Sequence, residues 1–564
     1  MKIMISESLP AEVKERIAAW LKEPYDAETQ KEVRTLQEKD PAALIDAFYT
    51  TIAFGTGGMR SLMGPGTNRL NKYTIQGTTQ GLANYILSQR KEVPKVFISY
   101  DSRNNSRLFA EETTRVLAGN GIEVFITKEP RPAPFVSFGC RYHRCTAAVM
   151  ITASHNPPEY NGYKVYWTDG AQVVPPHDTR IIAEVKKIQN PSQVKLADFK
   201  DDLIHEVKSG DDEAYFEALM PLQNHPDTNQ NHGKELKIVY SPLHGCGITT
   251  LPEELKRWGF TSLSLVEAQK APDGDFPSAY YPNPEQEQAL DLGIQQLLKE
   301  KGDLFLASDP DADRLGVVIR HDEHPVILNG NQIASLCLFY LCNTKSLPDN
   351  SAAITTIVTT ELFKTIADSY GVTSFEVLTG FKYIGEKIHE WEGSKEFSFL
   401  FGAEESLGFL YGTHSRDKDA TIAACLIAEM ALQLKLQNKT LIDLLSEIYK
   451  KYGPFLEKQL SVKFSAGKEG IETMKKLMKE LRANPPREIE GQKVIDIEDY
   501  LTGKTHTPLP KSNVLLFRLE DQSKFIIRPS GTEPKIKIYG LVRHQEKKWL
   551  EAALNHLKEG YLSP

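Results

Sequence analysis

The chain has 564 residues, which is too long for one hydrophobic core and predicts three or four domains. Its 40% hydrophobic and 25% charged residues are typical of a globular protein. The net charge of −8 argues against a nucleic-acid-binding protein, which needs a basic surface to displace counterions. No signal-peptide core and no apolar run near the roughly 18 residues of a membrane span is present, so we expect a cytoplasmic protein without a membrane partner.

The first forty or so residues are charged, and helices are expected over 11–21 and 27–36. Short apolar runs that end in polar turns then alternate with helical patterns such as 106–119. The runs in this part are Val96–Asp101, Ile122–Ile126 and Ala147–Ile151. This alternation is typical of βαβ units around a parallel or mixed sheet.

The same alternation returns twice further along the chain. Runs over 236–240 and 304–307 belong to a second round, and runs over 353–358 and 397–401 belong to a third. The polar segment 223–234 is expected to be an exposed loop. Because open α/β sheets bind ligands at the carboxyl ends of their strands, we expect functional loops directly after these runs.

The last hundred residues show a different pattern. Three neighbouring antiparallel strands and a closing helix are expected over 514–519, 524–528, 535–542 and 546–557. The predicted fold class is therefore α/β, with three similar α/β domains that contain mixed sheets and a smaller C-terminal α+β domain. The predicted domains are 1–205, 206–325, 326–455 and 456–564.

One serine directly follows a buried run in the segment Thr152-Ala153-Ser154-His155-Asn156-Pro157. A serine hydroxyl is a weak nucleophile that needs a base and charge neutralisation, and His155 and Lys164 lie close in sequence. The pattern is not the Gly-x-Ser-x-Gly turn of an esterase. Ser154 is therefore a candidate nucleophile, and the alternative is that it only caps a turn.

Three aspartates, Asp309, Asp311 and Asp313, occupy alternate positions after the run 304–307. Their oxygens suit Mg²⁺ or Ca²⁺ better than zinc. An EF-hand is excluded because Arg314 and Arg320 stand where that loop needs glycine and glutamate. The alternative is a solvated acidic turn, although carboxylates this close repel each other without a counter-ion.

Three further loops carry polar groups suited to an anionic or sugar ligand. The segment Arg528-Pro529-Ser530-Gly531-Thr532-Glu533-Pro534-Lys535 resembles a phosphate-binding nest, with a plain β-turn as the alternative. The segment 402–408 offers carboxylates and a hydroxyl that can bind vicinal sugar hydroxyls, or it is a surface turn. The segment 55–60 lacks the features of a dinucleotide or P-loop motif, so Arg60 is expected to contact an anion.

Taken together and in this order, the five loops resemble those of the α-D-phosphohexomutase superfamily over nearly the whole chain. The segment Asn161-Gly162-Tyr163-Lys164-Val165-Tyr166-Trp167 is most similar to the branch of long bacterial α-phosphoglucomutases, eukaryotic phosphopentomutases and glucose-1,6-bisphosphate synthases. The resemblance implies four domains around a central cleft.

The resemblance also implies roles for individual residues. Ser154 would carry a phosphoryl group, and Asp309, Asp311 and Asp313 would bind one Mg²⁺ per subunit together with an oxygen of Ser154 or its phosphate. Lys164 would be the general acid/base with support from His155, and Arg314 would lie against the phosphoserine or the substrate. The implied substrate-binding residues are Arg60, Thr379, Gly380, Glu404, Ser406, Lys418, Arg528, Ser530, Gly531, Thr532 and Lys535.

The implied activity is an isomerase of glucose metabolism that interconverts glucose 1-phosphate and glucose 6-phosphate. Glucose 1,6-bisphosphate would be its intermediate and activator, and its partner would be a phosphosugar rather than nucleic acid or a membrane. Phosphomannomutase, phosphopentomutase and glucose-1,6-bisphosphate synthase activities remain alternatives, as does a catalytically silent relative. The sequence does not indicate the oligomeric state.

Overall fold

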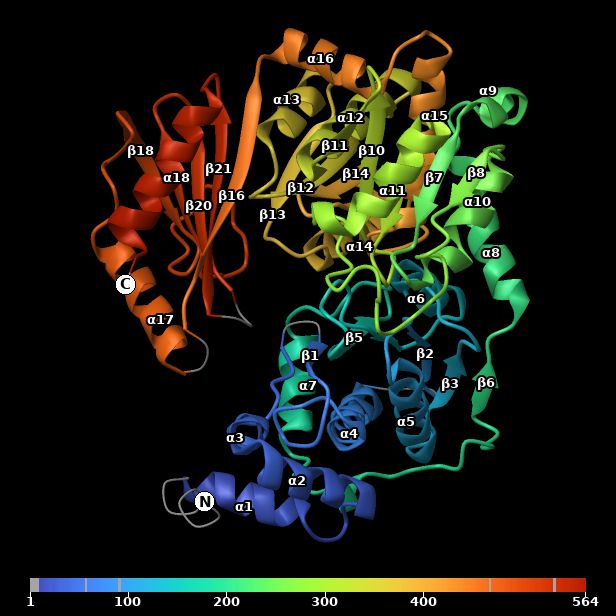
Figure 1. Cartoon of the computed structure of the whole chain (residues 1–564), viewed down its shortest axis with the longest axis vertical. Coiled ribbons are helices and arrows are strands. Elements are labelled where there is room, and N and C mark those ends of the chain that lie inside the picture. Colours follow the sequence, from blue (N-terminus) through green and yellow to red (C-terminus); the bar gives the residue numbers. More distant parts are fainter. Residues whose placement is uncertain (1–9, 56–57, 90–92, 466–467, 531–533, 564) are drawn as a thin grey trace. The chain divides into compact units, whose positions relative to one another are not determined.

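The computed structural model describes residues 10–55, 58–89, 93–465, 468–530 and 534–563. The chain forms two compact units. Unit 1 comprises Met1–Ile327, Gly385–Gly393 and Gly408–Leu432, and unit 2 comprises Leu328–Ile384, Ser394–Leu407 and Gln433–Pro564. Figure 1 gives the labels of the helices and strands. Among the described residues, no helix is both long and apolar enough to cross a membrane.

Unit 1 begins with three helices: α1 (Ala11–Trp20), α2 (Ala27–Lys39) and α3 (Pro41–Phe48). The first two confirm the predicted helices, and the third was not predicted. Asp26 caps α2 by accepting a hydrogen bond from the Thr29 amide at 2.9 Å. Val13, Trp20 and Phe48 belong to the small apolar core that joins the three helices.

The first sheet is mixed, as predicted, with the strand order β1-β5-β4-β2-β3-β6. Strands β2, β3, β4 and β6 are parallel, whereas β5 runs antiparallel to both β4 and β1. The strands are β1 (Gly58–Leu62), β2 (Lys95–Tyr100), β3 (Glu123–Ile126), β4 (Ala147–Ile151), β5 (Tyr160–Trp167) and β6 (Ile204–Glu206). The helices are α4 (Lys72–Gln89), α5 (Ser106–Gly119), α6 (Ala133–Tyr142) and α7 (His177–Val185).

Alternate residues of the central strands pack on opposite faces of this sheet, as strand geometry requires. Val96 and Val149 belong to the core that contains residues of α4 and α5. Phe97, the next residue along β2, instead packs near Phe135 of α6 with ring centroids 6.1 Å apart. The central strands are therefore covered on both faces, which explains their continuous apolar runs.

The second sheet has the order β11-β10-β9-β7-β8, in which β7, β8 and β9 are parallel and β10 is antiparallel to β9. The strands are β7 (Ile238–Ser241), β8 (Leu263–Leu265), β9 (Leu304–Ser308), β10 (Leu315–His321) and β11 (His324–Leu328). The helices are α8 (Ser209–Leu219), α9 (Pro226–His232), α10 (Leu251–Arg257) and α11 (Glu287–Glu300). The loop predicted over 223–234 was wrong, because Pro226 opens the short helix α9 there.

The third group of elements is shared between the units. In unit 2, β12 is parallel to both β13 and β14. The strands are β12 (Ser351–Thr356), β13 (Thr373–Val377), β14 (Ser398–Glu404) and β15 (Gly408–Tyr411). The helices are α12 (Gly330–Thr344), α13 (Glu361–Ser369), α14 (Lys382–Ser394), α15 (Ala420–Lys435) and α16 (Leu441–Tyr452). Strand β15 and most of α14 and α15 belong to unit 1.

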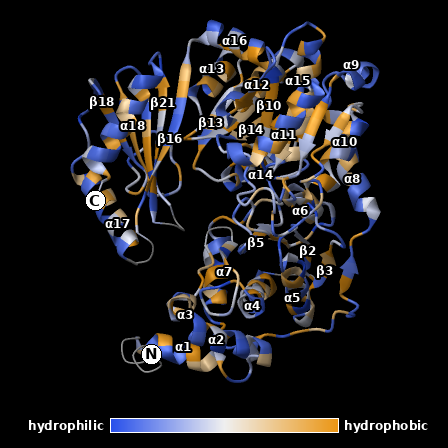
Figure 2. Cartoon of the chain, in the orientation of Figure 1, coloured by the Kyte–Doolittle hydropathy of each residue, from blue (hydrophilic) through white to orange (hydrophobic). Residues whose placement is uncertain are grey.

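The C-terminal sheet is entirely antiparallel, with the order β16-β21-β20-β19-β18-β17. The strands are β16 (Phe455–Lys463), β17 (Glu488–Ile489), β18 (Gln492–Asp499), β19 (Leu515–Leu519), β20 (Lys524–Pro529) and β21 (Lys535–Arg543), with helices α17 (Lys468–Ala483) and α18 (Lys547–Tyr561). The three predicted strands and the closing helix are confirmed. Figure 2 shows much of this sheet as hydrophobic.

Both faces of the C-terminal sheet are buried. Phe517 and Ile527 share a core with Leu550 and Leu554 of α18. On the other face, Leu516 and Ile526 belong to a core that includes Ile357 and Leu378 from the preceding group. The domain boundaries predicted near residues 205, 325 and 455 fall within β6, within β11 and at the first residue of β16. They stay a prediction.

Candidate active site

Ser154 follows β4 on a tight turn of unit 1. Its φ of 52° lies in the left-handed region, which non-glycine residues rarely adopt. The side chain is 2% exposed. Its Oγ donates to Asp309 Oδ2 at 2.6 Å and lies 3.0 Å from His155 Nδ1. The structure therefore joins the candidate nucleophile to the predicted metal loop.

Arg103 fixes the main chain of the serine loop, a role that sequence reasoning missed. Its guanidinium donates to the carbonyl oxygens of Ser154 (2.5 Å), Asn156, Pro157 (2.8 Å) and Tyr160 (3.0 Å). Asp101 forms an ion pair with it at 3.3 Å, and both side chains are fully buried. A sequence pattern could have indicated Asp101 and Arg103, because they lie where the apolar run 96–101 ends in a polar turn. The other functional loops follow the same pattern.

The aspartate loop connects β9 to β10, and other segments of unit 1 hold its main chain. Three successive carbonyl groups of the loop accept backbone hydrogen bonds from distant residues. The donors are Cys246 to Pro310 (2.9 Å), Ala133 to Asp311 (2.9 Å) and Ala420 to Ala312 (3.2 Å). Ala312 has a φ of 48°. The loop is thus fixed from three sides in a strained turn, which is common at functional sites.

The three aspartates have the properties of a hard-cation site. All are buried, and one oxygen of each lies within 4.8 Å of the others. Oδ1 of Asp311 and Oδ1 of Asp313 are buried and accept no hydrogen bond. Buried carboxylate oxygens without donors are costly unless a cation binds them. Asp309, Asp311 and Asp313 therefore fit Mg²⁺, which prefers such oxygen ligands.

The surroundings shift the pKa values of Asp309 and Asp313 in opposite directions. Burial, followed by the charges of Asp311 and Asp313, raises the pKa of Asp309 well above its usual range. Burial alone would also raise the pKa of Asp313, but Lys164 and Lys418 hold it well below its usual range. Lys164 Nζ lies 2.7 Å from Asp311 Oδ2 and 3.0 Å from Asp313 Oδ2. The pair of lysines thus already neutralises part of the acidic loop.

His155 and Lys164 have opposite proton affinities. Burial and the nearby Arg314 guanidinium lower the pKa of His155 well below its usual range, so its ring is neutral at pH 7. Burial would lower the pKa of Lys164, but Asp311 and Asp313 raise it instead. At pH 7 His155 is therefore neutral beside Ser154 Oγ, and Lys164 keeps its proton and its positive charge.

Lys418 joins the same cluster from the loop before α15. Its Nζ lies 3.1 Å from Asp313 Oδ2 and 2.9 Å from Asp417 Oδ1. The other Asp417 oxygen accepts hydrogen bonds from the Tyr166 hydroxyl and the Gln172 amide, both at 2.9 Å. Asp417 was not among the predicted site residues. It holds Lys418 in a fixed position beside the aspartate loop.

Two arginines lie close to the serine and aspartate loops. Arg60 of β1 donates to Asn156 Oδ1 at 2.8 Å, so its exposed guanidinium lies beside the serine loop. Arg314 Nη1 lies 3.7 Å from Glu285 and its Nε lies 3.9 Å from Asp313. The structure therefore brings together Arg60, Ser154, His155, Lys164, Asp309, Asp311, Asp313, Arg314 and Lys418 within unit 1.

Unit 2 contains the other predicted residues. The Glu404 carboxylate ends β14 and accepts a hydrogen bond from the Gly380 amide at 2.8 Å. Gly380 has a φ of 116°, which favours glycine at that position. Thr379 precedes it, and Ser406 is half-buried two residues after Glu404. The two predicted sugar-binding segments therefore form one local group.

The predicted phosphate loop lies in the hairpin between β20 and β21. Arg528 pairs with Lys537 in this ladder, and the Ser530 amide donates to the Lys535 carbonyl at 2.8 Å. Arg528, Ser530 and Lys535 are half-buried. Gly531 and Thr532 lie outside the described residues. Arg528 of β20 and Lys535 of β21 are thus two cationic residues on neighbouring strands.

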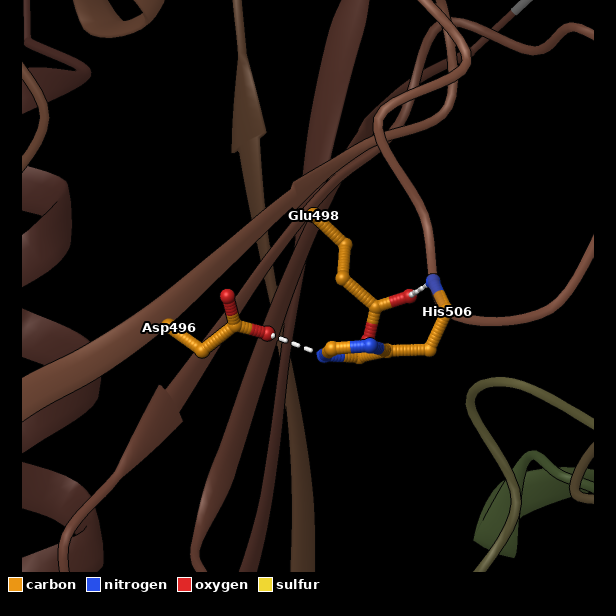
Figure 3. Close-up of side chains that lie close together, drawn as sticks. All are labelled: Asp496, Glu498 and His506. Carbon is orange, nitrogen blue, oxygen red and sulfur yellow. Dashed lines mark hydrogen bonds and ion pairs between the residues drawn. The ribbon is translucent and has the colours of Figure 1, made fainter.

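A second group of possible ligands, Asp496, Glu498 and His506, lies in the C-terminal part of unit 2 (Figure 3). His506 Nε2 lies 2.7 Å from Asp496, and its amide donates to Glu498 Oε2 at 3.1 Å. Glu498 Oε1 also accepts two hydrogen bonds from Arg518, at 2.7 and 3.0 Å. Because both Glu498 oxygens have donors, this group is explained without a cation.

Comparison with known families decides the identity of the chain. Residues 51–192, 213–322 and 329–452 match, in order, the models of alpha/beta/alpha domains I, II and III of phosphoglucomutase/phosphomannomutase. The chain belongs to the phosphoglucomutase/phosphomannomutase family. The resemblance to the α-D-phosphohexomutase superfamily is thereby confirmed, as is the predicted succession of α/β domains.

Relatives within the family match almost the full chain. A phosphoglucomutase of Staphylococcus haemolyticus is 38% identical over 528 residues, which is 91% of this chain and 92% of the relative. One of Staphylococcus epidermidis is 39% identical over 508 residues, with 88% and 91% covered. The Paramecium phosphoglucomutase parafusin has the same fold, with a TM-score of 0.69 at 18% identity over 91% of this chain and 95% of parafusin.

Proposed function

We propose that this enzyme interconverts glucose 1-phosphate and glucose 6-phosphate through a phosphorylated Ser154. One observation carries the proposal. The Ser154 hydroxyl lies 2.6 Å from a carboxylate of the buried aspartate loop, and Lys164 contacts the other two aspartates of that loop. This arrangement combines a nucleophile, a cation site and positive charge, which phosphoryl transfer requires.

In the proposed first step, the bond between phosphorus and Ser154 Oγ breaks, and a bond forms between phosphorus and the free hydroxyl of the sugar phosphate. Asp309, Asp311 and Asp313 would hold Mg²⁺, which supplies positive charge to the phosphoryl oxygens when bound. The proton that the sugar hydroxyl loses ends on Ser154 Oγ, and His155, whose Nδ1 lies 3.0 Å from that oxygen, is placed to relay it. Lys164 supplies positive charge beside the aspartate loop, and its general acid/base role is part of the proposal. The second step reverses the first at the other end of the sugar bisphosphate.

The remaining predicted residues have proposed binding roles. Glu404 and Ser406, with Thr379 and Gly380, would bind the sugar hydroxyls, and Lys418 would bind the sugar or its phosphate. Arg60 and Arg314 would contact phosphoryl oxygens. The non-reacting phosphate would be bound by Arg528, Ser530, Gly531, Thr532 and Lys535. We propose one Mg²⁺ per subunit and glucose 1,6-bisphosphate as the activator.

The test compares the initial rates of purified enzyme with glucose, mannose and ribose 1-phosphates in the presence of Mg²⁺. The glucose substrate is expected to have the highest kcat/KM. Intact-mass measurement after incubation with glucose 1,6-bisphosphate should show one added phosphoryl group, and the Ser154→Ala variant should show none. Faster turnover of another sugar phosphate would overturn the substrate assignment. Full activity of Ser154→Ala would overturn the mechanism.

A further inference from the structure

A cavity of about 680 Å³ lies between the N-terminal helices of unit 1 and the helices that cover the first sheet. Its walls come from α1, the segment 51–54, α4 and the segment 182–194. None of the residues placed around Ser154 lines it. Sites for small organic ligands usually measure about 300–1,000 Å³ and are lined by aromatic and apolar side chains. The cavity has the size of such a site.

Aromatic rings form the wall contributed by the N-terminal helices. Trp20 and Tyr25 stack with their ring centroids 4.3 Å apart, and Tyr25 meets Tyr73 of α4 edge-on at 4.7 Å. Trp20 is itself anchored against Phe48 at 5.5 Å. Rings that pack on one another in this way are already ordered, so a planar ligand would bind them at a low cost in conformational entropy.

Gly77 of α4 leaves room one helical turn after Tyr73. A Cβ atom added to Gly77 would meet only Ile188 Cγ2, at an ordinary contact distance of 3.7 Å. Alanine would therefore be accommodated there, and it would favour the helix by about 1 kcal/mol. Position 77 therefore has room for a larger side chain beside Ile188 of the cavity lining.

The charged residues that line the cavity are all cationic. They are Arg16 and Lys186, and no lining residue is a carboxylate. This composition contrasts with the chain as a whole, which has a net charge of −8. A cationic lining on an acidic protein favours an anion over a neutral or cationic ligand.

We propose that this cavity is a second ligand site, which binds an organic anion with a planar aromatic body. The rings of the ligand would pack against the half-buried rings of Tyr25 and Tyr73, and its acidic group would lie beside Lys186. Arg16 adds positive charge to the lining, and its guanidinium also donates to the carbonyl oxygens of Phe48 and Tyr49 and lies 3.6 Å from Glu12. The wall also connects to the catalytic part of unit 1, because the Thr78 hydroxyl donates to Met59 Sδ at 3.2 Å. Met59 precedes Arg60, whose guanidinium binds Asn156 of the serine loop.

The test uses 8-anilino-1-naphthalenesulfonate as the probe and the full-length native enzyme. The fluorescence of the probe should increase to saturation as it binds, with one probe molecule bound per chain. Saturating glucose 1,6-bisphosphate should not displace it, because the cavity shares no residue with the catalytic group. Displacement by the bisphosphate would overturn the proposal, since it would place the probe in the catalytic site. Absence of saturable binding would overturn it as well.

A matched pair of variants locates the bound probe. Gly77→Leu would place a bulky side chain in the cavity beside Ile188 and should weaken probe binding by at least about tenfold. Gly210→Leu adds the same side chain to another helical glycine with open space around it, and should leave binding unchanged. Thermal melting would verify that both variants are folded. Equal binding by both would overturn the proposal.

Two further measurements test the need for an anion and do not depend on the Gly77 variant. N-phenyl-1-naphthylamine, which has the same rings without the sulfonate, should bind at least about tenfold more weakly. Lys186→Gln removes an exposed cation of the lining and should weaken binding of the sulfonate but not of the amine. Equal affinity of the two probes for the wild-type enzyme would overturn the charge assignment.

Discussion

Arg103 Nη2 and the carbonyl oxygen of Ser154 lie 2.5 Å apart, so the backbone of the proposed nucleophile is bound to a buried guanidinium. Asp101 balances that guanidinium, and its own Oδ1 accepts from the Arg103 amide and the Ser106 hydroxyl. The orientation of Ser154 thus depends on an ion pair at the end of β2. Ser154 is not a glycine, and its backbone lies in the left-handed region, so this strained conformation needs support from surrounding residues.

Replacing Arg103 by lysine should therefore misplace Ser154 without removing any reacting group. A lysine keeps the charge near Asp101 but cannot bind several carbonyl groups in the planar geometry of a guanidinium. We expect kcat to fall by about 10²-fold, as small misplacements of reacting groups do, with little change in KM. Steady-state kinetics would measure both quantities.

Arg107→Lys is the matched control for Arg103→Lys. Arg107 forms an exposed i,i+4 pair with Glu111 on α5, and such pairs contribute little. Its kinetics should equal those of the wild type. If Arg103→Lys changed KM alone, the positioning role would be wrong.

Asp311→Asn should weaken the binding of Mg²⁺. Asp311 Oδ1 is buried and accepts no hydrogen bond, which identifies it as an available cation ligand. We expect the Mg²⁺ concentration for half-maximal activity to rise by about 10²-fold or more, because one of three charged ligands is lost. Titration of activity against Mg²⁺ would measure the shift.

The control for the metal ligand lies in the other carboxylate group. Asp496→Asn alters the Asp496, Glu498 and His506 group, in which Glu498 is already saturated with donors (Figure 3). It should leave the Mg²⁺ dependence unchanged. A similar Mg²⁺ shift in both variants would contradict the assignment of the metal to the aspartate loop.

Asp417→Asn should act through Lys418. Asparagine can still bind Tyr166 or Gln172, but it cannot hold the Lys418 ammonium by charge. We expect kcat/KM to fall by about tenfold, roughly the value of one charge-assisted hydrogen bond. In a double-mutant cycle, adding Asp417→Asn to Lys418→Met should cause little further loss. Additive losses would show that Asp417 has a separate role.

The predicted functional residues share a local signal, whereas the missed residue Asp417 does not. Ser154, Asp309 and Glu404 each follow an apolar run, so strand ends could be located from the sequence. Asp417 binds Tyr166 across 251 residues, and no local pattern encodes such a contact. The helix α9 was missed for a different reason, since its polar composition resembles that of a loop. Sequence patterns thus locate the ends of strands, whereas tertiary packing determines which side chains support the loops that follow.

Glu254 of α10 predicts a pH dependence of stability that is separate from catalysis. Its side chain is fully buried, and one carboxylate oxygen has no hydrogen-bond donor. Burial raises its pKa from 4.5 to about 8, although the Trp258 ring nitrogen donates to it at 2.7 Å. Between these pH values the folded protein keeps a proton that the unfolded chain has released. The contribution of Glu254 to the free energy of unfolding therefore falls as pH rises from 5 to 8.

Glu254→Gln removes this dependence, because glutamine stays neutral and can still accept the Trp258 hydrogen bond. Over three pH units, at about 1.4 kcal/mol each, the effect of Glu254 reaches an upper limit of roughly 4 kcal/mol. The variant should therefore gain thermal stability relative to the wild type as pH rises from 5 to 8, with little difference near pH 5. Melting temperatures of both proteins across that range would measure the gap. Parallel curves would show that Glu254 ionises equally in the folded and unfolded states, and would contradict the raised pKa.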